Sequence, residues 1–302
     1  FEKYTGAPTP GVAPGVFRAT QLFTARGCLG KCIFCCSEHV FGRRIRSRSV
    51  AHIMREVNEC ASRFGFNHFT IDNDTFTHDR AHAIEFCEAI SGKGLTWDCD
   101  TRVDRIDAEL LGAMARSGCV KVAFGVETGS ERILKAIKKG ITLDQVRSAF
   151  DMSKKAGLLT CAFFMIGNHP EEDEDDIKKT AEFIREISPD LITVAIATPY
   201  PGTELNKAMR EAGLLEGEPE WSEFGGSFRG RHLTRTNTIG PERLTELQSR
   251  LLRGFYLRPK YILRRLSLIR NSRDALYWFK AGASFIMYIL GGRKSDSTRI
   301  RR

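Results

Sequence analysis

The sequence contains no apolar run long enough to cross a lipid bilayer. Its longest apolar segment, residues 275–290, is 16 residues long and is interrupted by Lys280, whereas a spanning helix needs about 20 residues. No signal peptide is visible at the start of the sequence, and no internal repeat is present beyond an alternation of short segments. These absences argue against a transmembrane protein and a repeat array. Arg270, Arg273, Arg293 and Lys294 flank residues 275–290, so a helix at a membrane surface, a packed core helix and a subunit contact remain open there.

A disulfide framework is also missing, although the chain has nine cysteines. A chain of 302 residues that is 42% hydrophobic can form a stable core without disulfide bonds. Six cysteines are scattered through mostly apolar surroundings, which indicates buried free thiols in a reducing cytoplasm: Cys36, Cys60, Cys87, Cys99, Cys119 and Cys161.

The other three cysteines, Cys28, Cys32 and Cys35, lie on one short loop and are separated by three and then two residues. Clustered thiolates of this kind predict a metal site. A closed structural zinc site normally takes four ligands. Three thiolates on a 4Fe–4S cluster instead leave one iron free to bind a small molecule.

The net charge of +9 is confined to the end of the chain. Residues 231–302 contain 17 Lys and Arg against 4 Asp and Glu, whereas residues 1–230 contain 29 against 33. A basic tail on an otherwise acidic chain weakens the case for a nucleic-acid-binding protein.

The pattern of Pro, Gly and apolar residues divides the chain into five parts. Residues 1–16 form a Pro/Gly-rich linker, 17–213 an α/β domain, 214–240 an irregular loop, 241–290 a helical extension and 291–302 a disordered basic tail. Within the α/β domain, strands are expected at 22–25, 68–71, 95–101, 120–126, 158–166 and 191–197, and helices at 49–64, 79–90, 108–116, 131–137, 143–156, 175–187 and 204–212. Six such units predict a partial (β/α)6 barrel, with a doubly wound open sheet as the alternative.

Unusual residues follow the predicted strands, where parallel α/β folds place their functional sites. They are the cysteine loop, Asp72 and Asp74, Arg102, Glu127, Gly167, and Pro201 with Gly202. This arrangement predicts an enzyme.

Several of these motifs resemble those of the radical S-adenosylmethionine (SAM) superfamily. They are the cysteine loop, residues 124–130 (FGVETGS), residues 165–167 (MIG) and residues 199–203 (PYPGT). Together with residues 72–77 and 256–259, these motifs resemble those of one branch of the superfamily. Members of that branch carry an N-terminal cobalamin-binding domain, and examples are the anaerobic magnesium-protoporphyrin ester cyclase and the hopanoid-modifying enzymes. The resemblance covers residues 17–270.

The resemblance implies a fold, two cofactors and a set of roles. A partial barrel would carry a 4Fe–4S cluster on Cys28, Cys32 and Cys35, and the cluster would cleave SAM to a 5′-deoxyadenosyl radical that takes hydrogen from a small or lipid-like metabolite. An electron donor such as flavodoxin or ferredoxin is implied as a partner. The resemblance implies that SAM is bound by Phe34, Arg102, Glu127, Ser130, Gly167, Pro201 and Gly202. Asp72 and Asp74 are candidates for catalytic residues.

Simpler roles remain open for several of these residues. Glu127 is also suited to cap the following helix, and Arg102 to form a structural ion pair. Asp72 and Asp74 are typical turn formers, here ahead of a helix capped by Thr77.

The sequence departs from the family pattern in two places. Residues 167–172 read GNHPEE where GLPGE is the commoner form, and no Asp-x-His-x-x-Gly cobalamin motif occurs. Either the chain is a piece of a longer protein or it works without cobalamin, and the start at Phe1 after a Pro/Gly linker favours a piece. The alternatives are a tRNA methylthiotransferase and a zinc-binding nucleic-acid module that uses Cys36 as its fourth ligand.

Overall fold

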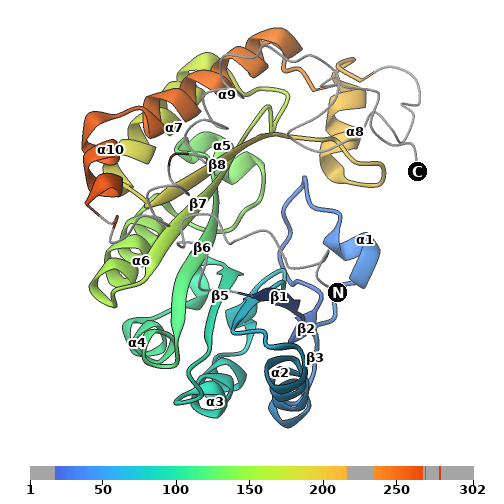
Figure 1. Cartoon of the computed structure of the whole chain (residues 1–302). Helices are drawn as coiled ribbons and strands as arrows, with labels where there is room; N and C mark the ends of the chain where they lie inside the picture. Colours follow the sequence, from blue (N-terminus) through green and yellow to red (C-terminus); the bar gives the residue numbers. More distant parts are fainter. Residues whose placement is uncertain (1–17, 216–233, 268, 270–278, 280–302) are drawn as a thin grey trace, which may run out of the picture.

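The computed structural model describes residues 18–215, 234–267, 269 and 279. Its centre is a six-stranded parallel sheet, β1 (Ala19–Leu22), β4 (His68–Ile71), β5 (Thr96–Thr101), β6 (Cys119–Glu127), β7 (Leu159–Ile166) and β8 (Leu191–Ile196). The strands lie side by side in chain order. A doubly wound sheet reverses direction at a switch point, so that alternative is wrong and the predicted partial (β/α)6 barrel is confirmed (Figure 1).

Helices connect the strands and cover one face of the sheet. They are α2 (Val50–Phe64), α3 (Arg80–Ile90), α4 (Ala108–Arg116), α5 (Glu131–Ala136), α6 (Leu143–Lys155) and α7 (Glu174–Ile187), with short 3₁₀ turns at Phe76–His78 and Val103–Arg105. The main hydrophobic core fills the space between these helices and the sheet, and includes Phe69, Trp97 and Phe124. Because strand side chains alternate, Asp98 and Asp100 on β5 point to the opposite, inner face.

The loop after β1 corrects one predicted strand. Residues 22–25 were expected to be continuous, but β1 ends at Leu22 and Ala25–Arg26 (β2) pairs instead with Arg46–Ser47 (β3), away from the main sheet. The side-chain oxygen of Asn73 accepts hydrogen bonds from the backbone N–H groups of Thr24 and Ala25 at 3.0 and 3.2 Å. This side chain turns the chain off the sheet and into the cysteine loop, which leads to α1 (Ser37–Phe41).

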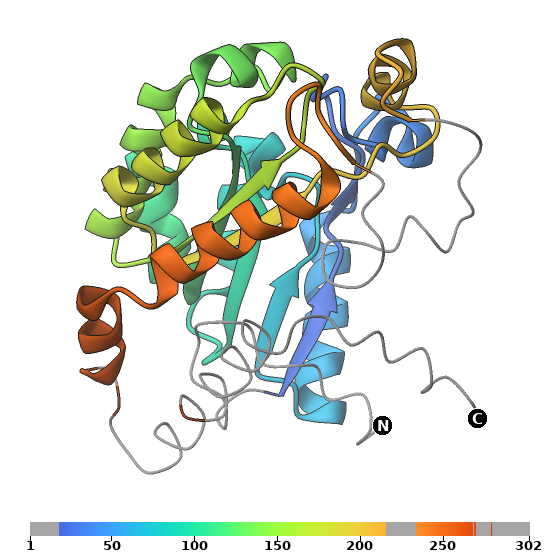
Figure 2. The ribbon, with the colours of Figure 1, turned by 90° about the horizontal axis from the view of Figure 1, so that it is seen from above.

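The far edge of the sheet is covered by α9 (Pro241–Tyr256), which runs along β8 (Figure 2). Gln248 donates to the carbonyl of Val194 at 2.7 Å, and the Tyr256 hydroxyl bonds both the N–H and the C=O of Ile192. These bonds protect an edge strand that would otherwise present unpaired backbone groups. After α9 the chain continues into α10 (Pro259–Leu266), and α8 (Glu204–Glu211) lies near the opposite end of β8.

No helix of the described residues is long and apolar enough to cross a membrane. Apart from Phe279, the apolar segment at 275–290 lies outside the described residues, as do the linker, the tail and most of the loop at 214–240.

Candidate active site

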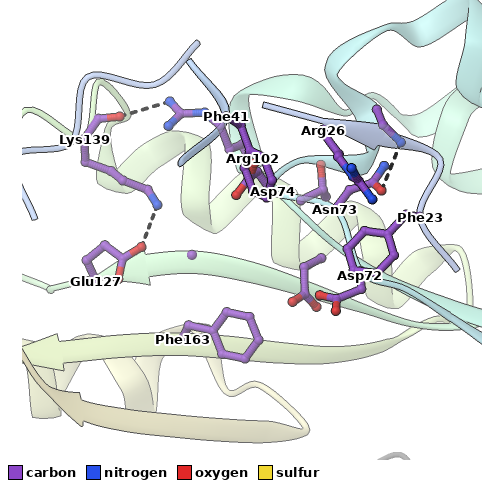
Figure 3. Close-up of a pocket in the computed structure, with 14 residues that line it drawn as sticks. Phe23, Arg26, Phe41, Asp72, Asn73, Asp74, Arg102, Glu127, Lys139 and Phe163 are labelled. Atoms are coloured by element: carbon purple, nitrogen blue, oxygen red, sulfur yellow. Dashed lines mark hydrogen bonds and ion pairs between the residues drawn. The ribbon is translucent and has the colours of Figure 1, made fainter. Parts of the chain in front are cut away.

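A cavity of about 390 Å³ opens at the carboxyl ends of the strands. Its walls carry aromatic, acidic and basic side chains from five strand ends of the main sheet, from β2, from α1 and from the turn after α5: Phe23, Ala25, Arg26, Phe41, Asp72, Asn73, Asp74, Asp100, Thr101, Arg102, Gly125, Glu127, Lys139 and Phe163 (Figure 3). The fold therefore brings four of the sequence-predicted residues, Asp72, Asp74, Arg102 and Glu127, into one space.

The cysteine loop folds around Gly30, which lies next to the sulfurs of Cys28 and Cys32. A Cβ at Gly30 would lie 3.3 Å from the Cys28 sulfur and 3.7 Å from that of Cys32, so both thiols flank this glycine. The Gly30 N–H donates to Cys28 Sγ at 3.3 Å and the Ser37 N–H to Cys35 Sγ at 3.4 Å. Backbone donors of this kind stabilise cluster thiolates.

The donor type of these thiols fits an iron–sulfur cluster, because such clusters are held by cysteine thiolates. Among the residues that the structure describes, no three His, Cys, Asp or Glu side chains are grouped to hold one metal ion. Burial raises the pKa of the Cys32 thiol, and that of Cys35 to about 11; the positive charge of bound iron acts in the opposite direction.

Glu127 forms a buried ion pair with Lys139 at one end of the cavity. The Lys139 ammonium donates to Glu127 Oε1 at 2.5 Å, and both side chains are about nine-tenths covered (Figure 3). Glu127 has a left-handed backbone (φ 70°), which aims its carboxylate back along β6 toward the lysine. Burial alone would lower the pKa of Lys139, but the adjacent Glu127 charge raises it above its usual value. Lys139 could not be recognised from the sequence as a partner of Glu127, because it lies 12 residues along the chain.

Arg102 connects this pair to the cysteine loop. Its guanidinium binds Asp104 through two nitrogens, at 2.9 and 3.1 Å, and donates to the Lys139 carbonyl at 3.0 Å. A Cβ at Gly30 would lie 3.7 Å from the same guanidinium. Arg102 thus makes a structural ion pair and also lines the cavity beside the loop.

The other end of the cavity is acidic. Asp74 accepts a hydrogen bond from Ser37 at 2.9 Å, and Asp72 points into the space beside Phe23 and Phe163 (Figure 3). Asp100, which sequence reasoning missed inside a predicted strand, also lines the wall. Burial raises the pKa of Asp100 to about 6, with Asp98 and Asp72 adding to the shift and Lys121 opposing it. The predicted Thr77 cap is wrong, because Asp79 caps α3 and Thr77 hydrogen-bonds Thr101.

Five further predicted residues lie outside the lining of this cavity. Phe34 packs against the core, and the buried Ser130 hydroxyl caps α5 and donates to Asp176. The Gly167 N–H donates to the buried Glu172 carboxylate. Pro201 and Gly202 form a turn beside His39.

With this geometry in view, the chain belongs to the radical SAM superfamily, whose family model matches residues 22–184. Membership implies a 4Fe–4S cluster and SAM as cofactors, and defines the chain as an enzyme. Cys28, Cys32 and Cys35, Glu127 and Arg102 all lie within the matched range.

Several curated proteins of this superfamily are similar to the chain in sequence. An uncharacterized methyltransferase of Pyrococcus horikoshii is 33% identical over 80% of this chain and 52% of its own length. The cytidylyl-2-hydroxyethylphosphonate methyltransferase of Streptomyces wedmorensis is 30% identical over 80% and 46%. A putative methylthiotransferase of Methanocaldococcus jannaschii is 35% identical over 60% and 42%. The chain thus spans about half the length of the curated relatives it matches most fully.

Two further matches include a cyclase of the kind that the sequence motifs resemble. The anaerobic magnesium-protoporphyrin IX monomethyl ester cyclase of Rubrivivax gelatinosus is 30% identical over 60% of this chain and 33% of its own length. Among solved structures, the cobalamin-dependent radical enzyme OxsB with aqua-cobalamin and SAM bound has a TM-score of 0.67 at 17% identity, over 90% of this chain and 46% of that one. At this identity the likeness supports the fold alone.

Proposed function

We propose that Cys28, Cys32 and Cys35 hold the 4Fe–4S cluster and that the adjoining cavity holds SAM and the reacting part of the substrate. The observation that carries the proposal is the position of the three-thiol loop, directly beside a cavity at the carboxyl ends of the strands. When bound, the cluster supplies the electron that cleaves SAM to a 5′-deoxyadenosyl radical. The chain's own residues bind SAM, orient it and shield it from water.

The basic and acidic groups at the cysteine end of the cavity match the charged parts of SAM. Arg102 and Lys139 are suited to the SAM carboxylate, because guanidinium and ammonium groups donate strong charge-assisted hydrogen bonds. Glu127 is suited to the SAM ammonium or ribose hydroxyls. Lys139 forms an ion pair with Glu127, so SAM would exchange one buried ionic contact for another. Phe34, Ser130, Gly167, Pro201 and Gly202 are proposed to support this site from outside the cavity lining.

The acidic end is left for the substrate, a small or lipid-like metabolite. Asp72 and Asp100 face the cavity beside Phe163, which combines an apolar surface with hydrogen-bond acceptors. Asp72 and Asp74 remain catalytic candidates on the same wall. Methyl transfer is the outcome we propose first, supported by two methyltransferase relatives that match 80% of this chain. Ring formation is the neighbouring possibility, supported by the cyclase relative. A cobalamin cofactor in the whole protein and a flavodoxin or ferredoxin electron donor belong to this proposal.

Cluster loading tests the cysteine assignment. The wild-type chain, reconstituted without oxygen, should bind about four irons and show the broad visible absorbance of a 4Fe–4S cluster. Cys32→Ala should lose most of that iron. Cys36→Ala is the matched control, because it removes a neighbouring thiol and should leave iron loading unchanged. Equal iron in the two variants would contradict the assignment, and loading with zinc alone would support the alternative of a zinc module.

Methylthio transfer is the second candidate, favoured by the match to the putative methylthiotransferase. The two candidates differ in what else the full-length protein binds. Proteins similar to methylthiotransferases carry a second three-cysteine domain, so the purified full-length protein would hold about eight irons. A methyltransferase of the cobalamin branch would instead hold about four irons and one corrinoid, which is visible in its absorbance spectrum.

A further inference from the structure

The end of the described chain presents an apolar and basic surface that the radical chemistry does not use. Of the eight large hydrophobic side chains exposed in the described residues, four lie within ten positions: Leu257, Ile262, Leu263 and Leu266, with exposures of 48, 42, 66 and 55%. We call these four residues the α10 patch. Isolated exposed leucines are ordinary, whereas a contiguous group marks an interaction surface.

The patch is held in a fixed orientation by the other side of α10. The Tyr261 ring packs on those of Phe255 and Tyr256, with centroids 5.1 and 5.2 Å apart. Arg264 binds the Asp190 carboxylate at 2.7 Å. Tyr261 and Arg264 lie on one side of the helix, so Ile262, Leu263 and Leu266 are turned outward together.

The chain around the patch carries charge of one sign. Residues 257–266, which span the patch, contain four Lys and Arg and no Asp or Glu. Two copies facing each other through this surface would bring like charges together. A nucleic acid would satisfy the charges but would leave the aliphatic side chains without apolar partners. An anionic bilayer satisfies both, because it offers an apolar layer beneath a negative surface.

We propose that the α10 patch docks the protein on an anionic lipid bilayer. The leucine and isoleucine side chains enter the acyl boundary, while Arg258, Lys260 and neighbouring basic residues contact lipid phosphates. This is attachment at the surface, consistent with no described helix being able to span a membrane. It does not depend on the cluster assignment.

Attachment through this surface would orient the enzyme. The Tyr256 hydroxyl, just before α10, bonds Ile192 at the amino end of β8, whereas the cavity lies at the carboxyl ends of the strands. Figure 1 shows α10 and α8, which follows the carboxyl end of β8, on opposite sides of the molecule. The cavity would therefore open away from the bilayer, separated from it by roughly the 20 Å length of a strand.

Vesicle flotation tests the proposal with the full chain. Wild type should float with vesicles of phosphatidylcholine containing about one-third phosphatidylglycerol. Binding should fall about tenfold or more with phosphatidylcholine alone, because the basic residues then lose their attraction to an anionic surface. The variant L263E/L266E should lose at least about tenfold in bound fraction. Val40→Glu is the matched control, because Val40 is equally exposed at 65% on α1 and should leave flotation unchanged.

Three results would overturn the proposal. The first is no flotation of wild type with the anionic vesicles, or equal flotation of L263E/L266E, once gel filtration and circular dichroism show that the variant is folded. The second is a dimer by light scattering that L263E/L266E converts to a monomer, which would make the surface a subunit interface. The third is tight binding of an RNA oligonucleotide that removes the protein from the vesicles, which would make it a nucleic-acid surface.

Discussion

Gly125 shows how closely the backbone of β6 approaches the charged pair at the cysteine end of the cavity. A Cβ at this position would lie 2.6 Å from both the Glu127 carboxylate and the Lys139 ammonium. Only glycine leaves room for the pair to close over the strand. The charged end of the cavity therefore depends on a residue that carries no chemistry of its own.

Removing the lysine should affect both folding and SAM binding. Lys139→Met leaves the Glu127 carboxylate buried without its ammonium partner, which typically costs about 3–5 kcal/mol. We expect a lower urea midpoint and weaker SAM binding by calorimetry. Lys138→Met is the matched control, because Lys138 pairs with Glu204 at the exposed surface, where such pairs contribute about 0–1 kcal/mol. Equal effects of the two substitutions would contradict the role given to Lys139.

The buried carboxyl group of Glu172 should make the stability of the folded protein depend on pH. Burial raises the pKa of this carboxyl to about 8, although the N–H groups of Asn168 and Gly167 partly oppose the shift. A carboxyl whose pKa is higher in the folded than in the unfolded state stabilises folding most at low pH, and this contribution is lost as the pH rises toward 8. Glu172→Gln keeps an oxygen acceptor and removes the ionisation.

The melting temperature of E172Q, relative to that of wild type, should therefore be higher at pH 8.5 than at pH 5. Thermal unfolding at both pH values measures the difference. The interpretation is wrong if that difference stays constant across the range.

At the scale of elements, α9 is the helix that closes the open edge of the sheet. Tyr256→Phe removes the hydroxyl that serves both backbone groups of Ile192, and Gln248→Met removes the donor to Val194. Each substitution should cost about 1–3 kcal/mol, because a buried backbone group loses its partner. Amide hydrogen exchange should increase in β8 first. Unchanged exchange in β8 would show that α9 does not protect this edge.

The order of the elements could be predicted from the sequence because most strands are short apolar runs and most helices have an amphipathic repeat. The same pattern predicted which polar residues end or follow the strands. It therefore placed Asp72, Arg102 and Glu127 together at the carboxyl edge of the sheet. The break at Leu22 could not be predicted, because it depends on a hydrogen bond from the Thr24 N–H to the side chain of Asn73, about 50 residues away.

Among the cavity residues that sequence reasoning missed, Asp100 and Lys139 were missed for related reasons. Asp100 alternates with core residues inside β5, and only the direction of its side chain places it in the cavity. Lys139 follows a helix rather than a strand, and its contact with Glu127 depends on the turn at residues 137–140. Both depend on tertiary packing that no local pattern specifies.

At the scale of the whole molecule, the two ends of the sheet have different roles. The carboxyl end carries the three-thiol loop and the cavity, and the amino end of β8 carries α10 and its apolar, basic surface. Cluster chemistry and membrane attachment are thus separated along the strands, so substitutions in the α10 patch should leave SAM cleavage in solution unchanged. A tenfold loss of cleavage in L263E/L266E, assayed without vesicles, would contradict this separation.

Formation of 5′-deoxyadenosine tests the central claim most directly. The anaerobically reconstituted chain, reduced with dithionite and mixed with SAM, should release 5′-deoxyadenosine, which mass spectrometry quantifies. Wild type and Cys36→Ala should produce it at similar rates, and Cys32→Ala should produce none above background. Release from Cys32→Ala at the wild-type rate, or none from an iron-loaded wild type, would contradict a SAM-cleaving cluster on this loop.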